Sequence, residues 1–169
     1  MVMHARDVLD VLDVLAEDRI DPILAGGWGI EALLGSQHRD HDDLDIVILD
    51  DELDATLASL VAVGFEVDTD ERPARVVTAD AAGRRVDLGV VRSDGRGDLW
   101  ALPTEPGGPD QRYPAAEITS GWIGGRPVRC LGPVLQVALH LAGTPGLHDQ
   151  ADLERLRVRL GLTLPSGDS

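Results

Sequence analysis

The residues best suited to chemistry are the acidic side chains Asp43 and Asp45, which open the apolar run Ile46 to Leu49. Side chains alternate across a β-strand, so these two would lie on one face with their Cα atoms about 7 Å apart. Two carboxylates at that spacing can share divalent ions. Because the group offers oxygen ligands and no cysteine, it favours Mg²⁺ or Mn²⁺, which act together with substrate phosphates. Taken alone, the pair is also typical of a solvated acidic loop before a strand.

Two further features favour the metal interpretation. Residues 26–29, Gly-Gly-Trp-Gly, end a short apolar run and begin a helical pattern, which offers backbone N–H groups to an anion such as a triphosphate. Asp87 is the one acid in the apolar run Val86 to Val91, where an unpaired carboxylate is costly unless a metal ion or a proton satisfies it. Taken alone, it is also typical of a strand-end residue that faces water. Together, the glycine turn and three carboxylates indicate a two-metal site for phosphoryl or nucleotidyl transfer.

Other motifs leave alternatives open. Residues 27–32 match the dinucleotide pattern G-x-G-x-x-A, but Gly35 ends the helix before it could cross a sheet. A D-x-D strand would also suit a transferase that uses a nucleotide sugar. His41, His140 and His148 could act as acids or bases, although a hydrogen-bonded structural histidine is the simpler interpretation of each.

The composition excludes several classes of protein. All 15 residues counted as lysine or arginine are arginine, so a Walker A loop, Schiff-base chemistry and lysyl-nucleotide ligation are excluded. The net charge of −15 and the five aromatic residues argue against a nucleic-acid or anionic-membrane partner. Residues 1–71 hold 19 of the 30 acidic side chains and three of the arginines. The single cysteine, Cys130, and the lack of a long apolar segment predict a cytoplasmic protein.

The elements that must position these residues can be predicted from periodicity and from turn residues. At 169 residues the chain can build one core without staples. Helices are expected at 6–17, 133–141 and 149–160, together with a short helix that the glycine turn opens and Gly35 ends, and a helix capped by Asp50 or Asp51 that runs through Val61. Strands are expected at 23–25, 44–49, 65–67, 75–78 and 85–91, a hairpin at 122–130, and a loop-rich segment at 93–108. This mixture without strict βαβ alternation predicts an α+β domain with a mixed sheet.

The glycine turn and the acidic strand together resemble a known signature. The segment from Gly26 to Gly35, followed by Arg39, His41 and the D-x-D at 43–45, resembles small antibiotic nucleotidyltransferases of the DNA polymerase β-like superfamily. The resemblance is strongest to lincosamide nucleotidyltransferases and next to aminoglycoside 2″-nucleotidyltransferases. It continues through residues 86–88, the hairpin at 121–130 and the C-terminal helix, so it covers most of the chain.

The resemblance implies an α+β nucleotidyltransferase fold, with a mixed sheet flanked by helices. Residues 1–132 would form the nucleotidyltransferase domain. Residues 133–164 would form a C-terminal helical segment packed on it, and residues 165–169 a frayed tail. In its site, Asp43, Asp45 and Asp87 would bind two Mg²⁺ ions. The site's triphosphate-binding residues would be Gly26, Gly27 and Arg39, and Asp87 would be either a metal ligand or the catalytic base.

The activity implied is a Mg²⁺-dependent transfer of AMP from ATP to a hydroxyl of a small, cationic, antibiotic-like acceptor, lincosamide or aminoglycoside, by a homodimer. Two departures leave the acceptor open: Gly89-Val90 stands where the lincosamide enzymes tend to carry His-Pro, and His38 replaces the residue that usually precedes the arginine. A non-catalytic nucleotide-binding or antitoxin-like relative of the same fold is the alternative.

Overall fold

A computed structural model of the chain describes residues 1–142 and 147–161, without the side chains of 147–149. The tail expected at 165–169 and the side chain of His148 therefore lie outside the described residues. In the described part, no helix is both long and apolar enough to cross a membrane.

The described residues form helices and strands close to those expected. The helices are α1 (Ala5–Glu17), α2 (Gly26–Leu34), α3 (Leu53–Ala62), α4 (Pro133–Ala142) and α5 (Leu147–Leu160), with short 3₁₀ turns η1 (Asp50–Glu52) and η2 (Ala115–Glu117). The strands are β1 (Ile23–Leu24), β2 (Asp43–Leu49), β3 (Phe65–Glu71), β4 (Arg75–Asp80), β5 (Arg85–Ser93), β6 (Leu99–Ala101), β7 (Gln111–Tyr113), β8 (Ile118–Ile123) and β9 (Arg126–Leu131).

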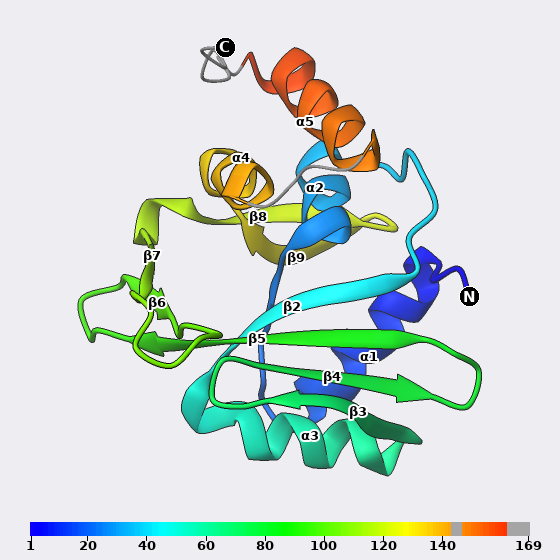
Figure 1. Cartoon of the computed structure of the whole chain (residues 1–169). Helices are drawn as coiled ribbons and strands as arrows, with labels where there is room; N and C mark the ends of the chain where they lie inside the picture. The colour runs from blue at the N-terminus through cyan, green and yellow to red at the C-terminus, as the bar shows by residue number, and fades with distance from the viewer. Residues whose placement is uncertain (143–146, 162–169) are drawn as a thin grey trace.

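These strands form one mixed sheet in the order β3-β4-β5-β2-β1-β9-β8, with β6 and β7 branching from the end of β5 (Figure 1). The pair β2–β5 is parallel, as is β1–β9, whereas β1–β2 and β4–β5 are antiparallel. The mixed sheet is therefore confirmed. Within the loop-rich segment expected at 93–108, Leu99–Ala101 forms the strand β6, which was not predicted; it adds to the edge of β5 by antiparallel pairing.

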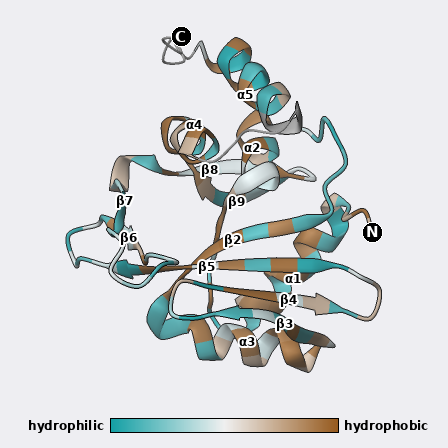
Figure 2. Cartoon of the chain, viewed as in Figure 1, coloured by the Kyte–Doolittle hydropathy of each residue, from teal (hydrophilic) through white to brown (hydrophobic). Residues whose placement is uncertain are grey.

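The two faces of the sheet are covered differently. On one face, α1 and α3 pack on the buried, alternate residues of β2 and β5, including Leu44, Ile46 and Leu88, and form the main core. The opposite face carries a smaller apolar cluster with Val47 and Val91. Figure 2 shows the strongly apolar centre of β2 and β5 between these layers. Because strands alternate, the acidic side chains of β2 belong to this less covered face.

Helix α2 follows β1 directly, as the glycine turn predicts. Gly35 ends α2 with φ +76°, the left-handed conformation that favours glycine at a helix C-terminus. The helix crosses β8 so closely that a Cβ atom on Gly121 would collide with the backbone of Ala32. Figure 1 shows α4 and α5 grouped beside α2, at the end of the sheet formed by β8 and β9.

Candidate active site

The parallel pairing of β2 and β5 brings three predicted carboxylates to one face of the sheet. Asp45 and Asp87 are direct Cα partners across the two strands, although 42 positions separate them in the sequence. Asp43 is the partner of Arg85, one alternation earlier on the same face of β2. The structure thus places Asp43, Asp45 and Asp87 on one face of neighbouring strands.

Asp45 lies at the centre of this row. Its burial, followed by the charges of Asp43 and Asp87, raises the pKa of its carboxyl to about 7, while Arg75 acts in the opposite direction. No described residue donates a hydrogen bond to this carboxylate. A Cβ atom on Gly26, which has φ +54°, would collide with it. Glycine is therefore needed at the start of α2 both for its backbone conformation and for the approach of Asp45.

Asp87 has a partner that sequence reasoning missed. Arg75 of β4 donates hydrogen bonds from Nε to Oδ1 and Oδ2 of Asp87 (2.9 and 3.0 Å) and from Nη2 to Oδ2 (2.5 Å). Its Nη1 also bonds Glu71 at 3.0 Å. Asp87 therefore does not depend on a metal ion or a proton, as its place in an apolar strand had suggested, because an arginine from the neighbouring strand pairs with it.

The first turn of α2 lies next to the carboxylates. Its N-cap residue, Ala25, has no side chain that could accept from the first N–H groups, so these donors can serve an anion. A Cβ atom on Gly27 would collide with the ring of His41 and come within 3.1 Å of Nη2 of Arg39. The two glycines expected to hold a triphosphate and the arginine expected to neutralise it thus gather at one helix N-terminus.

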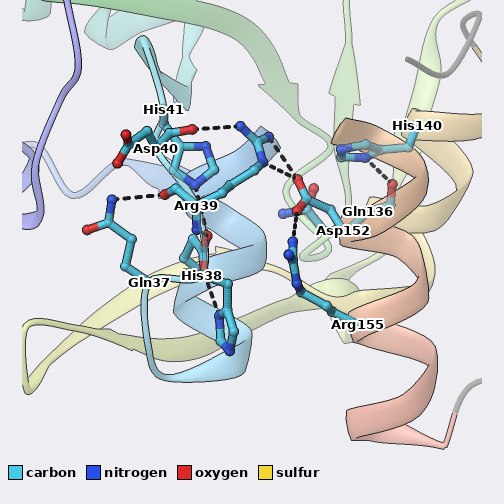
Figure 3. A network of polar contacts seen from close by, with 10 residues as sticks. Gln37, His38, Arg39, Asp40, His41, Gln136, His140, Asp152 and Arg155 are labelled. Carbon is cyan, nitrogen blue, oxygen red and sulfur yellow. Dashed lines mark hydrogen bonds and ion pairs between the residues drawn. The ribbon is translucent and has the colours of Figure 1, made fainter. Parts of the chain in front are cut away.

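Arg39 is also tied to the C-terminal helix (Figure 3). Its Nε and Nη2 bond Oδ2 of the buried Asp152 of α5 at 2.9 and 2.8 Å, and Arg155 bonds Oδ1 at 3.1 Å. Its remaining nitrogen, Nη1, bonds the carbonyl oxygen of Asp40. The ion pair holds the guanidinium beside the start of α2, and the contact of Arg39 with phosphate stays a prediction.

A second buried acid, Glu31 of α2, fixes the loop that carries Arg39. Its carboxylate accepts hydrogen bonds from the ring of His38 and from that of the buried His41, both at 2.9 Å. Burial acts to raise the pKa of Glu31, but the hydrogen bonds from His41 and His38 outweigh it and lower the pKa. The structural interpretation of His41 is therefore confirmed, and His140 likewise bonds within α4, to the carbonyl oxygen of Gln136.

A cavity of about 450 Å³ opens next to the carboxylate row. Val47, Gly89 and Val91 line it, and they continue the face of β2 and β5 that carries Asp45 and Asp87. Its other wall comes from residues 101–105 and from 108, 109, 111 and 113, around β6 and β7. A molecule in this cavity would therefore contact Val47 and Gly89, which lie two residues beyond Asp45 and Asp87 on the same face of β2 and β5.

The donor set suits Mg²⁺ or Mn²⁺. It offers only carboxylate oxygens. Burial is the main cause of the raised pKa of Asp45, and the negative charges of Asp43 and Asp87, which add to it, are what a divalent cation would offset. Within residues 1–142 and 147–161, however, no three metal-ligating side chains are gathered tightly enough to form a ready-made site. Asp43 and Asp45 fit the role of ligands, whereas Asp87 is bound to Arg75; the two-metal site stays a prediction.

Sequence reasoning missed Arg75, Glu31 and Asp152. Arg75 and Asp152 give no local signal, because each meets its partner through long-range folding. Glu31 offers a weak one, since it is the only acid within the otherwise apolar helix 26–34.

Comparison with known proteins gives a consistent result. A family model described as aminoglycoside-2''-adenylyltransferase matches residues 7–156. A lincosamide resistance protein from Staphylococcus haemolyticus is 22% identical over 102 residues, which are 60% of this chain. The chain spans 63% of the length of that curated relative.

Two solved structures share the fold. The lincosamide antibiotic adenylyltransferase LnuA, solved with lincomycin bound, superposes with a TM-score of 0.84 at 19% identity, over 93% of this chain and 98% of that one. ANT(2")-Ia, solved in complex with adenylyl-2"-tobramycin, gives a TM-score of 0.69 at 19% identity, over 93% and 89% of the two chains. The expected nucleotidyltransferase fold is confirmed.

Proposed function

Because the chain belongs to the aminoglycoside-2''-adenylyltransferase family, we propose that it transfers AMP from ATP to a hydroxyl of a small antibiotic-like molecule. In this reaction the hydroxyl oxygen forms a bond to the α-phosphorus, and the bond between that phosphorus and the pyrophosphate oxygen breaks. The hydroxyl proton passes to the Asp87 carboxylate. Pyrophosphate leaves with the electron pair of the broken bond.

The observation that carries this proposal is the register of β2 and β5. It puts Asp45 directly opposite Asp87 and adds Asp43 on the same face, beside the uncapped first turn of α2. Carboxylates for a cation, N–H groups for an anion and a third carboxylate for a proton are what nucleotidyl transfer needs at one place. Scattered acidic residues on a solvated surface would not share this register.

Each part of the site has a role in the proposal. Gly26 and Gly27 make room for the Asp45 carboxylate and the His41 ring beside the first turn of α2, and Nη2 of Arg39 lies next to Gly27. In the proposal the N–H groups of this turn and Arg39 would bind the triphosphate. Asp43 and Asp45 would hold Mg²⁺, which when bound neutralises charge on the triphosphate oxygens. The raised pKa of Asp45 supports this role, since the carboxylate gains from a cation beside it.

The cavity next to the carboxylates is the proposed acceptor site. Arg75 and Glu105 are the charged members of its lining among the described residues, and Leu102, Pro103 and Tyr113 add apolar surface. Such a lining suits an acceptor with few positive charges. Within the two acceptor classes, it favours a lincosamide-type molecule over a polycationic aminoglycoside.

A homodimer, a cytoplasmic location and a helical segment at 133–164 that packs on the domain 1–132 complete the proposal. Light scattering on the purified chain measures the dimer directly. A monomer at micromolar concentration would contradict it.

Release of pyrophosphate tests the activity. The purified chain is incubated with ATP and Mg²⁺ and with a lincosamide or an aminoglycoside, and mass spectrometry looks for an acceptor heavier by one AMP. Asp45→Asn should abolish transfer. Asp42→Asn, which removes the same charge from an exposed neighbour, should not. If neither lincosamides nor aminoglycosides cause release of pyrophosphate, the proposal is overturned.

A second candidate, a relative that binds nucleotide without turnover, is favoured by one observation: Arg75 already engages both oxygens of Asp87. Calorimetry with a non-hydrolysable ATP analogue separates the candidates. Binding that persists in Asp87→Asn, with no transfer by the unaltered chain, would favour the non-catalytic relative.

A further inference from the structure

The three carboxylates of the row do not have equal surroundings. The Arg75 guanidinium donates three hydrogen bonds of 2.5–3.0 Å to the two carboxylate oxygens of Asp87. A further hydrogen bond to Glu71 holds this forked guanidinium in place. The hydrogen bond to Asp87 is the main cause that raises the pKa of the Arg75 guanidinium, and the one to Glu71 adds to it. Burial of Arg75 acts in the opposite direction. The Asp87 side chain is 16% exposed and that of Arg75 is 40% exposed. The paired, charge-assisted hydrogen bonds, rather than burial of both partners, distinguish this contact from an ordinary surface ion pair.

Asp43 and Asp45 lack such a partner. Among the described residues, none donates a hydrogen bond to either carboxylate, and neither forms an ion pair. The Asp45 carboxylate packs closely beside Gly26, and Asp45 is the Cα partner of Asp87 on the neighbouring strand. Two carboxylates of the row thus have their oxygens available to a cation, while the third already has a cationic partner.

Arg75 also borders the cavity. It lies in its lining together with Gly89, which is its Cα partner on β5, two positions beyond Asp87. The Arg75 guanidinium therefore lies between the three carboxylates and the cavity. Its hydrogen bonds to Asp87 hold that carboxylate on the side of the cavity.

Resting on the proposed transferase function, we propose that Arg75 is a positioning residue that separates the roles of the carboxylates. It keeps Asp87 outside the coordination sphere of the cation held by Asp43 and Asp45. It thereby reserves Asp87 for the acceptor hydroxyl that arrives from the cavity.

Two physical effects support this separation. A guanidinium within hydrogen-bond distance of Asp87 repels a divalent cation that would share the same oxygens. A carboxylate has about four lone-pair positions, so Asp87 can still accept one hydrogen bond from a neutral hydroxyl while the fork fixes its orientation. Lysine in place of Arg75 would keep the charge but lose the two-pronged geometry.

A double-mutant cycle on Mn²⁺ binding tests the proposal. Mn²⁺ alone, without nucleotide or acceptor, is titrated into the unaltered chain, Arg75→Met, Asp87→Asn and the double variant, and free Mn²⁺ is measured by electron paramagnetic resonance. Methionine keeps the aliphatic volume of the arginine stem. Arg72→Met, which removes an exposed arginine paired with Asp70, is the matched charge control.

We expect Arg75→Met to tighten Mn²⁺ binding roughly tenfold or more, because a repelling charge is removed and Asp87 becomes a ligand. Asp87→Asn should then weaken binding at least several-fold more in the Arg75→Met background than in the unaltered one. Charge effects alone would give Asp87→Asn the same effect in both backgrounds, and that result would overturn the proposal. Arg72→Met should leave Mn²⁺ affinity nearly unchanged.

Circular dichroism checks that each variant is folded. If Arg75→Met does not fold, Arg75→Gln replaces it in the cycle, and the larger effect of Asp87→Asn is still expected because both the positive charge and the paired hydrogen bonds to Asp87 are lost. The cycle needs no turnover, so it fails or succeeds independently of whether an acceptor is found. Where activity is measurable, Arg75→Met should lower kcat while leaving the KM for ATP nearly unchanged.

Discussion

Replacing Asp45 with asparagine is expected to stabilise the metal-free protein at neutral pH, although it removes the central carboxylate of the site. In the folded chain the pKa of this carboxyl is about 7, compared with an ordinary value of 3.8. At a pH between these two values, the Asp45 carboxyl is protonated in the folded state and ionised in the unfolded state. The free energy of unfolding therefore falls as the pH rises from about 4 to about 7. Above pH 7 the full destabilisation by the ionised Asp45 is present.

The size of the effect follows from the pKa difference. Each pKa unit corresponds to about 1.4 kcal/mol, so the three-unit shift has a ceiling of about 4 kcal/mol at pH 8. Because part of the Asp45 residue stays exposed to solvent, screening reduces this, and about 2 kcal/mol is expected. Near pH 4 the carboxyl is protonated in the folded state and the difference between the two proteins should vanish.

Urea unfolding in EDTA at pH 4 and at pH 8 measures the difference. Asp42→Asn is the control, because it removes one negative charge from the exposed neighbour of the strand. Adding Mn²⁺ at pH 8 should stabilise the unaltered chain and not Asp45→Asn. A stability difference for Asp45→Asn that does not change with pH, or a loss of stability at pH 8, would refute the reasoning.

Three other perturbations have clear expected outcomes. Asp152→Asn should cost about 2 kcal/mol in urea unfolding, because it leaves the Arg39 guanidinium without its carboxylate partner in a partly buried place; an unchanged midpoint would mean that the pair is not formed. Gly121→Ala should destabilise the fold by about 2 kcal/mol or more in the same assay, since its methyl group collides with the backbone of Ala32, and a neutral result would show that α2 and β8 are not so close. The Cys130 thiol is buried, which raises its pKa to about 11, so it should resist a disulfide reagent at pH 8 until urea unfolds the chain; rapid labelling of the folded protein would contradict this.

Local patterns were sufficient for the elements around the site. The period of two in residues 43–49 puts Asp43 and Asp45 on one face of a strand whatever the rest of the fold does. The glycines at 26, 27 and 35 mark the beginning and end of α2 because their backbone freedom and small size act within a few residues. Helix and strand positions depend on such short-range periodicity and could be predicted well.

Local patterns do not predict the structure of the loop-rich segment 93–108. Leu99–Ala101 is only three residues long and carries no periodic pattern, so its strand exists only because the end of β5 offers an unpaired edge. The wall of the cavity next to the carboxylates is built from this part of the chain. The size and the lining of the cavity therefore could not be predicted from the sequence.

The sequence by itself determined that this chain has a glycine turn, two carboxylates on one strand face and a third acid on a later strand. The tertiary structure alone decided that Asp87 stands in register with Asp45, that Arg75 holds it, and that Arg39 is tied to Asp152, 113 positions away. The physical reason is one of range. Periodicity and turn residues act over a few residues, whereas strand register and ion pairs depend on which distant segments the common core brings together.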